Sequence, residues 1–117
     1  RPVMDLSKTE AFIMMPGQKY TVISPADNIK LTEEEVLGFI GSENLNGIIY
    51  IAAKASYIDA EFETLLVWDD VSKGGRNTIA NQVREENIGD CVDKIYGNAI
   101  LCHIDLLPDS LTVEQVE

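Results

Sequence analysis

Hydrophobic and polar residues alternate along two segments near the start of the chain. Residues 10–15 place Phe12 and Met14 on one face, and residues 19–24 alternate in the same way. A period of two residues is that of a β-strand. Pro16-Gly17 lies between the segments and favours a type II turn, because proline fixes φ at the first central position and glycine accepts the positive φ of the second. The pattern predicts a β-hairpin.

The clearest helix signal begins at Thr32. Glu35 follows three residues later, and this spacing is the capping box, in which each side chain binds the backbone amide of the other residue. We expect a helix over residues 33–40 that ends at Gly41. Gly38 lies inside it and costs about 1 kcal/mol relative to alanine. That residue indicates either close packing at this position or a short helix.

Further along the chain, the pattern predicts three more strands. They cover residues 48–53, 63–68 and 99–104, and the first is apolar on both faces, as expected of a central strand. Apolar residues at helical spacing predict a second helix over residues 77–87. Leu111-Thr112 has the features of a third helix start, although the chain stops about one turn later.

Together these elements predict an α+β fold, a mostly antiparallel sheet of about five strands with two to three short helices packed on one side of it. The length of 117 residues fits one domain. Residues 1–9 show no periodicity and are expected to be a flexible lead-in to a compact domain over residues 10–117. Because a helix of one turn is marginal, we expect the natural product to continue beyond Glu117.

Charge narrows the functional classes. The chain has 20 acidic and 9 basic side chains, a net charge of −11. Binding to a nucleic-acid backbone or to an anionic membrane requires lysine and arginine, so neither is expected. An acidic surface instead steers the chain toward a protein partner with a basic surface. A nucleic-acid mimic would need its carboxylates in one stripe, whereas dispersed charge would only aid solubility. The candidates for an acidic face are Glu33, Glu34, Glu35, Glu61, Glu63, Asp69 and Asp70.

Reactive side chains are few. Cys91, Cys102 and His103 give at most three metal ligands without zinc-site spacing, so we expect no metal and no cofactor. Adjacent residues of a strand point to opposite faces, which excludes a dyad of Cys102 with His103 and leaves Cys91 with His103 as the basis of a small enzyme, the least favoured function. With two cysteines and no glycosylation sequon, a reducing, cytoplasmic location is expected.

A glycine-containing loop precedes the second helix and offers a different function. Lys73, Gly74, Gly75 and Arg76 place two cations and two glycines before a helix N-terminus, where backbone amides attract anions. The order of the residues is not that of a P-loop. Binding of a small anion or nucleotide here is the alternative function, and an ordinary connecting loop is the competing structural interpretation.

The order of these features resembles a family of short domains of unknown function carried by phages, plasmids and their bacterial hosts. The residues concerned are Met15-Pro16-Gly17-Gln18, Ile40-Gly41, the strand over 65–70 and Tyr96-Gly97-Asn98-Ala99-Ile100. The resemblance implies a cytoplasmic accessory protein of a mobile element and no reaction. We therefore expect a non-enzymatic interaction protein with a basic partner, in a role such as modulation of host defence. Self-association through the strand at 10–15 is left open.

Overall fold

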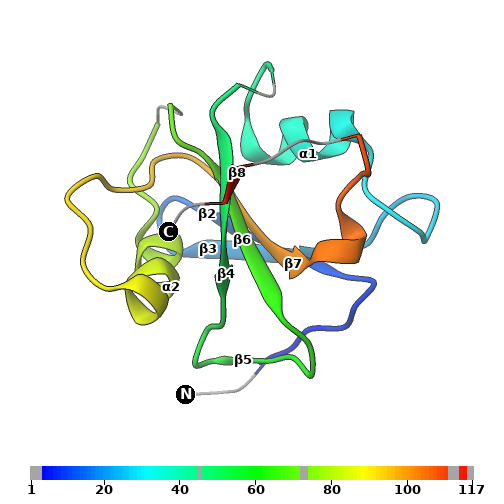
Figure 1. The fold of residues 1–117 in the computed structure, drawn as a ribbon, viewed down its shortest axis with the longest axis horizontal. Coiled ribbons are helices and arrows are strands. Elements are labelled where there is room, and N and C mark those ends of the chain that lie inside the picture. Colours follow the sequence, from blue (N-terminus) through cyan, green and yellow to red (C-terminus); the bar gives the residue numbers. More distant parts are fainter. Residues whose placement is uncertain (1–3, 45, 72–73, 111–113, 116–117) are drawn as a thin grey trace.

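The computed structural model describes residues 4–44, 46–71, 74–110 and 114–115. Its main element is a six-stranded sheet in the order β3-β2-β7-β6-β4-β8 (Figure 1). The strands are β2 (Ala11–Met15), β3 (Lys19–Ile23), β4 (Ile48–Ala53), β6 (Thr64–Asp69), β7 (Ala99–His103) and β8 (Glu114–Gln115). The first five pair antiparallel, and β8 runs parallel to β4. The predicted α+β fold with a five-stranded antiparallel sheet is confirmed.

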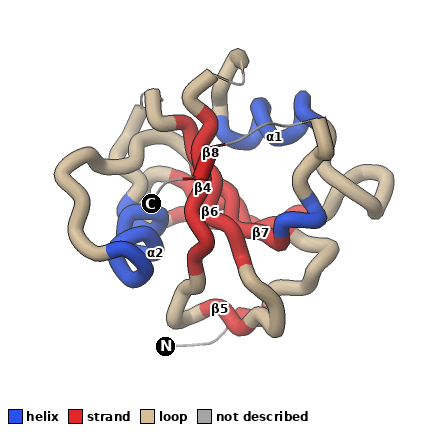
Figure 2. Tube along the Cα trace, viewed as in Figure 1, coloured by secondary structure: helices blue, strands red, loops and turns tan. Residues whose placement is uncertain are grey.

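Two helices pack on the sheet, α1 (Glu33–Ile40) and α2 (Thr78–Ile88). They lie on opposite sides of the strands (Figure 2). Val36 of α1 belongs to one core cluster, and Val83 of α2 belongs to the other. The prediction that the helices cover one side was therefore wrong. The middle strands are apolar on both faces, as in Leu65–Trp68, so both faces need a cover.

The start of α1 agrees with its sequence. The amide of Glu35 donates to Thr32 Oγ1 at 3.0 Å, and the amide of Thr32 donates to Glu35 Oε1 at 2.9 Å. The helix ends at Gly41, whose φ is +85°. A Cβ added at Gly38 would meet nothing within 4 Å, so close packing does not explain this glycine. The other explanation, a short helix, agrees with the structure, because α1 has only 8 residues.

The hairpin of β2 and β3 turns at Gly17, which has a φ of +81°. β2 pairs with β3 on one side and with β7 on the other. Residues 10–15 therefore do not form the free edge that self-association through this strand would require, and β3 is the edge strand of this side of the sheet. The strand at 48–53 is an interior strand, as predicted, since β4 pairs with β6 on one side and with β8 on the other.

The two ends of the described chain also differ from expectation. Residues 4–9 belong to the domain, because β1 (Met4–Asp5) pairs parallel with β5 (Ile58–Asp59) and Leu6 is 5% exposed. Met4 and Leu6 alternate with Asp5 and Ser7, but this pattern is too short to specify pairing with a distant segment of the chain. The helix start predicted at 111–112 lies outside the described residues, and Glu114–Gln115 form a strand. Neither described α-helix has the length and hydrophobicity needed to cross a bilayer.

A buried asparagine joins α2 to the sheet. Asn77 Oδ1 accepts from the amide of Ala80 at 3.1 Å, which caps the helix. Its Nδ2 donates to the carbonyl oxygens of Met14 and Gly97 at 3.0 and 2.8 Å. Since Asn77 is 0% exposed, its side chain is a buried link between the start of α2, β2 and the loop before β7.

Candidate functional site

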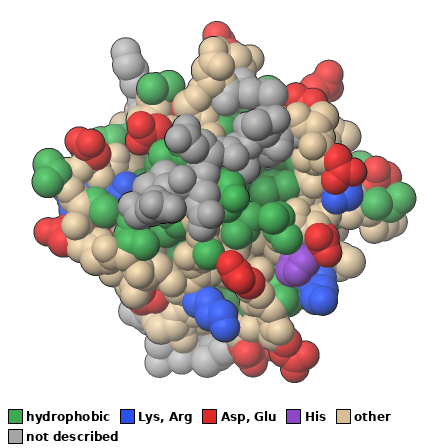
Figure 3. Space-filling view, in the orientation of Figure 1, with side chains coloured by type: hydrophobic (Ala, Val, Ile, Leu, Met, Phe, Trp, Pro, Cys, Tyr) green, Lys and Arg blue, Asp and Glu red, His purple; other side chains and the backbone are tan. Residues whose placement is uncertain are grey.

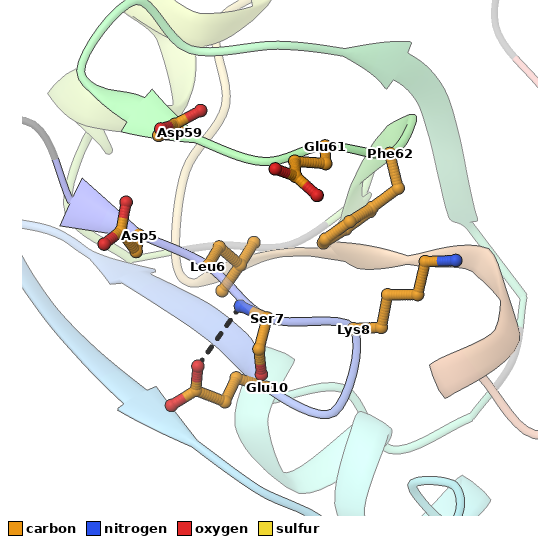
Figure 4. A pocket seen from close by; sticks show the side chains of 8 residues that line it. All are labelled: Asp5, Leu6, Ser7, Lys8, Glu10, Asp59, Glu61 and Phe62. Carbon is orange, nitrogen blue, oxygen red and sulfur yellow. Dashed lines mark hydrogen bonds between the residues drawn. The ribbon is translucent and has the colours of Figure 1, made fainter.

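A cavity of about 500 Å³ lies between the segment 5–10 and the segment 59–62. We call it the acidic hollow. Figure 4 shows the first segment along one wall and the second along the opposite wall. The lining residues are Asp5, Leu6, Ser7, Lys8, Glu10, Asp59, Glu61 and Phe62. The hydrogen bond from the Leu6 amide to the Asp59 carbonyl, 3.0 Å long, fixes the two walls to each other.

Four of the lining side chains are carboxylates, and Lys8 is the one cation among them. Asp5 and Asp59 are register partners in the β1–β5 pair, so the strand pairing places them side by side. The fourth carboxylate, that of Glu10, accepts a hydrogen bond from the Ser7 amide at 3.2 Å. Asp5, Asp59 and Glu61 form no ion pair with any residue that the structure describes. The hollow therefore carries a net negative charge, with Lys8 as its one cation and three carboxylates that form no described ion pair.

The hollow also has an apolar part. Leu6 is buried in the core, and Phe62 is half-buried against the same core cluster. The ring of Phe62 meets His103 edge to face, with ring centroids 5.0 Å apart. Phe62 and Glu61 also line a neighbouring cavity of about 400 Å³. The site thus combines carboxylates with apolar surface, which suits a side chain that has an aliphatic stem and a charged end.

The predicted acidic face is not assembled as one stripe. Glu61 lines the acidic hollow, and Glu63 lines the neighbouring cavity. Glu63 immediately precedes β6, whereas Asp69 is its last residue and is only 7% exposed. Acidic side chains are spread around the margin of the molecular face in Figure 3. A nucleic-acid mimic requires its carboxylates in one stripe, and these residues do not form one.

Of the four remaining members of that predicted face, Asp70 lines a separate hollow with Lys94, and the other three are the glutamates of the first turn of α1. Glu35 completes the capping box, and Glu33 accepts from the Ser110 hydroxyl at 2.6 Å. Carboxylates at this position also stabilise a helix through its dipole. A structural role therefore accounts for these residues.

The predicted anion loop is described only in part, because Lys73 lies outside the described residues. Gly75 accepts from the Gly97 amide at 2.9 Å, and a Cβ at Gly75 would lie 2.9 Å from Pro16 Cβ. This close approach explains the glycine without a ligand. Arg76 is exposed and forms a β-bridge with Tyr96. Anion binding at Lys73, Gly74, Gly75 and Arg76 stays a hypothesis.

The Cys91–His103 pair has no hydrogen bond between its members. Cys91 Sγ donates to the Gly89 carbonyl at 3.6 Å, and His103 Nδ1 accepts from the Asp105 amide at 3.0 Å. Cys102 is fully buried, and burial raises the pKa of its thiol to about 12. Within the described ranges, no three side chains of the metal-binding types come together. None of these groups is arranged as a nucleophile with its base.

A further hollow of about 410 Å³ includes Lys94, with Asp70, Val92, Asp93 and Tyr96 as the other lining residues. The Lys94 ammonium binds Asp90 at 3.0 Å and Glu85 at 3.2 Å. The hydrogen bond to Asp90 raises the pKa of Lys94 and lowers the pKa of Asp90. This cation is already paired, so the hollow has less unpaired charge to offer a ligand than the acidic hollow.

Comparisons with known proteins add no relative. A scan against models of protein families found no match, and searches of curated proteins and of solved structures found none either. The resemblance to phage and plasmid domains therefore stays a prediction.

Sequence reasoning found Glu61 but missed Asp5, Glu10 and Asp59 as members of one site. The alternation of acidic and apolar residues in Asp59-Ala60-Glu61-Phe62 is the signal that was present. Nothing local indicates that residues 4–5 pair with residues 58–59, because each strand has only two residues.

Proposed function

We propose that the chain is a non-enzymatic interaction module that binds a protein partner by holding one of the partner's basic side chains in the acidic hollow. The register pair of Asp5 and Asp59 is the observation that carries this proposal. Like charges on neighbouring strands destabilise a sheet, and a bound cation relieves the repulsion. Glu61 adds a third carboxylate to the same cavity.

The chemistry of arginine fits the hollow best. Its guanidinium has five N–H donors in a fixed plane, which suits two neighbouring carboxylates. Its aliphatic stem gains from contact with apolar surface such as Leu6 and Phe62. The cavity of about 500 Å³ falls within the range of roughly 300–1,000 Å³ typical of small-ligand sites. The net charge of −11 attracts basic partners at longer range.

A titration with a matched pair of probes tests this function. N-acetyl-arginine amide carries the charge, and N-acetyl-citrulline amide has nearly the same shape without it. We expect saturable NMR shifts at the amides of Leu6, Ser7 and Phe62 with the arginine probe and none with citrulline. Salt should weaken the shifts, since the Debye length falls to about 3 Å at 1 M. Equal shifts with both probes, or no saturable shift, would overturn the proposal.

A further inference from the structure

β3 leaves one side of the main sheet open. Within the described ranges it pairs with β2 alone, whereas β8 lies beyond β4 at the other side. The side chains from Lys19 to Val22 are exposed. An edge strand has a row of free N–H and C=O groups that can pair with another strand.

Charge favours a second copy at this edge. Two copies of a chain with a net charge of −11 repel each other over most of their surface. The longest stretch of the sequence without Asp or Glu runs from Ala11 to Ala26, and it contains β2, the turn and β3. Lys19 is the one charged side chain in that stretch. The edge is therefore a place where two copies approach with little repulsion.

We propose that two copies of the chain form a homodimer by antiparallel pairing of their β3 strands around a two-fold axis at Thr21. In a continuous sheet, residues directly opposite each other share a face, so this register pairs all five residues of the strand. Tyr20 lies opposite Val22 of the partner subunit, and Lys19 lies opposite Ile23 of the partner subunit. Thr21 lies opposite Thr21 of the partner subunit.

The pairs in this register are favourable ones. Aromatic residues opposite β-branched residues and threonine opposite threonine each stabilise a sheet, and no like charges meet. The Tyr20 ring already stacks on Phe12, with centroids 4.6 Å apart, so little freedom is lost when a partner covers it. Tyr20 and Val22 are 47% and 38% exposed, which leaves apolar area to bury. The dimer does not involve the acidic hollow, and its test is independent of the proposed function.

Sedimentation velocity with a charge exchange at the two-fold axis tests the dimer. The sedimenting species of the wild type should have twice the mass of one chain of 12.9 kDa. The fraction of dimer should rise with salt concentration, because salt screens the repulsion between the two copies. Thr21→Glu and Thr21→Lys should each sediment as monomers at the same concentration, because each places like charges opposite each other. An equimolar mixture of the two should recover the dimer. Thr9→Glu makes the same charge change at an exposed loop position and should leave the dimer intact.

Three results would overturn this proposal. The first is a wild-type chain that remains monomeric at up to about 1 mM, a concentration at which even weak association is populated. The second is a dimer that persists in Thr21→Glu, which would place the contact on another surface. The third is a mixture of the two charged variants that stays monomeric.

Discussion

Asp5 and Asp59 lie directly opposite each other in the parallel β1–β5 pair. Neighbouring strands are about 4.8 Å apart, so the pairing brings two carboxylates together on one face. No described cation forms an ion pair with either of them. Such a pair lowers the stability of the free protein and favours a bound cation. Stability and binding should therefore change in opposite directions when one carboxylate is removed.

Asp59→Asn tests whether the repulsion between Asp5 and Asp59 lowers the stability of the free protein. Removal of one of two like charges should raise the free energy of unfolding by a fraction of a kcal/mol. Urea unfolding at low salt measures this gain, and higher salt should shrink it by screening. Asp70→Asn removes an exposed carboxylate that has no described ion pair and serves as the control. A loss of stability in Asp59→Asn relative to Asp70→Asn would count against the repulsion.

Asn77→Asp should destabilise the fold by about 2–4 kcal/mol. Aspartate keeps the oxygen that caps α2 but loses the amide donors, and the carbonyls of Met14 and Gly97 are then left without this partner. Denaturant unfolding measures the change. Asn46→Asp makes the same substitution at an exposed residue and should have little effect. Equal stability of the two variants would show that the Asn77 amide is not needed.

Two glycine-to-alanine substitutions should have opposite signs. Gly38→Ala lies in α1 with open space around the new Cβ, so it should stabilise the protein by up to about 1 kcal/mol. Gly47→Ala should destabilise it, since Gly47 has a φ of +90° and the Cβ would lie 2.7 Å from Asp69 Oδ1. Thermal unfolding of the pair measures both effects. A gain in Gly47→Ala would contradict the described turn.

The buried thiol of Cys102 predicts a loss of stability at high pH. Its pKa rises from 9.0 to about 12 in the folded protein, so the folded state holds the proton more tightly than the unfolded state. The stabilisation is complete below pH 9 and is lost as the pH rises toward 12, by up to about 1.4 kcal/mol per pH unit.

Urea unfolding of the wild type and of Cys102→Ala, compared as the pH rises above 9, isolates this contribution. The stability difference between the two proteins should shrink as the pH rises, because only the wild type has the buried thiol. Alkylation in the folded state should modify Cys91, which is partly exposed, and spare Cys102. A stability difference that does not change with pH would contradict the raised pKa of the Cys102 thiol.

Local signals in the sequence predict the elements well but not their long-range pairing. The capping box at Thr32 and Glu35 is complete within four residues, and the structure confirms it. The pairing of β1 with β5 joins two segments far apart in the chain, and strands of only two residues are too short to specify their partner. The two-sided packing was indicated by the apolar run Leu65–Trp68 in β6 and was missed. Glu61 was predicted from charge alone, without its cavity.

The affinity of two charge-matched double variants for N-acetyl-arginine amide tests the central claim most directly. Asp59→Asn/Glu61→Gln changes the acidic hollow, and Glu34→Gln/Asp70→Asn removes two exposed carboxylates elsewhere, so each pair shifts the net charge from −11 to −9. We predict that the first pair loses binding by tenfold or more, since one hydrogen bond between charged groups is worth about 1.5–3 kcal/mol, and that the second pair binds like the wild type. Equal loss in both pairs would show that net charge, and not the acidic hollow, holds the cation.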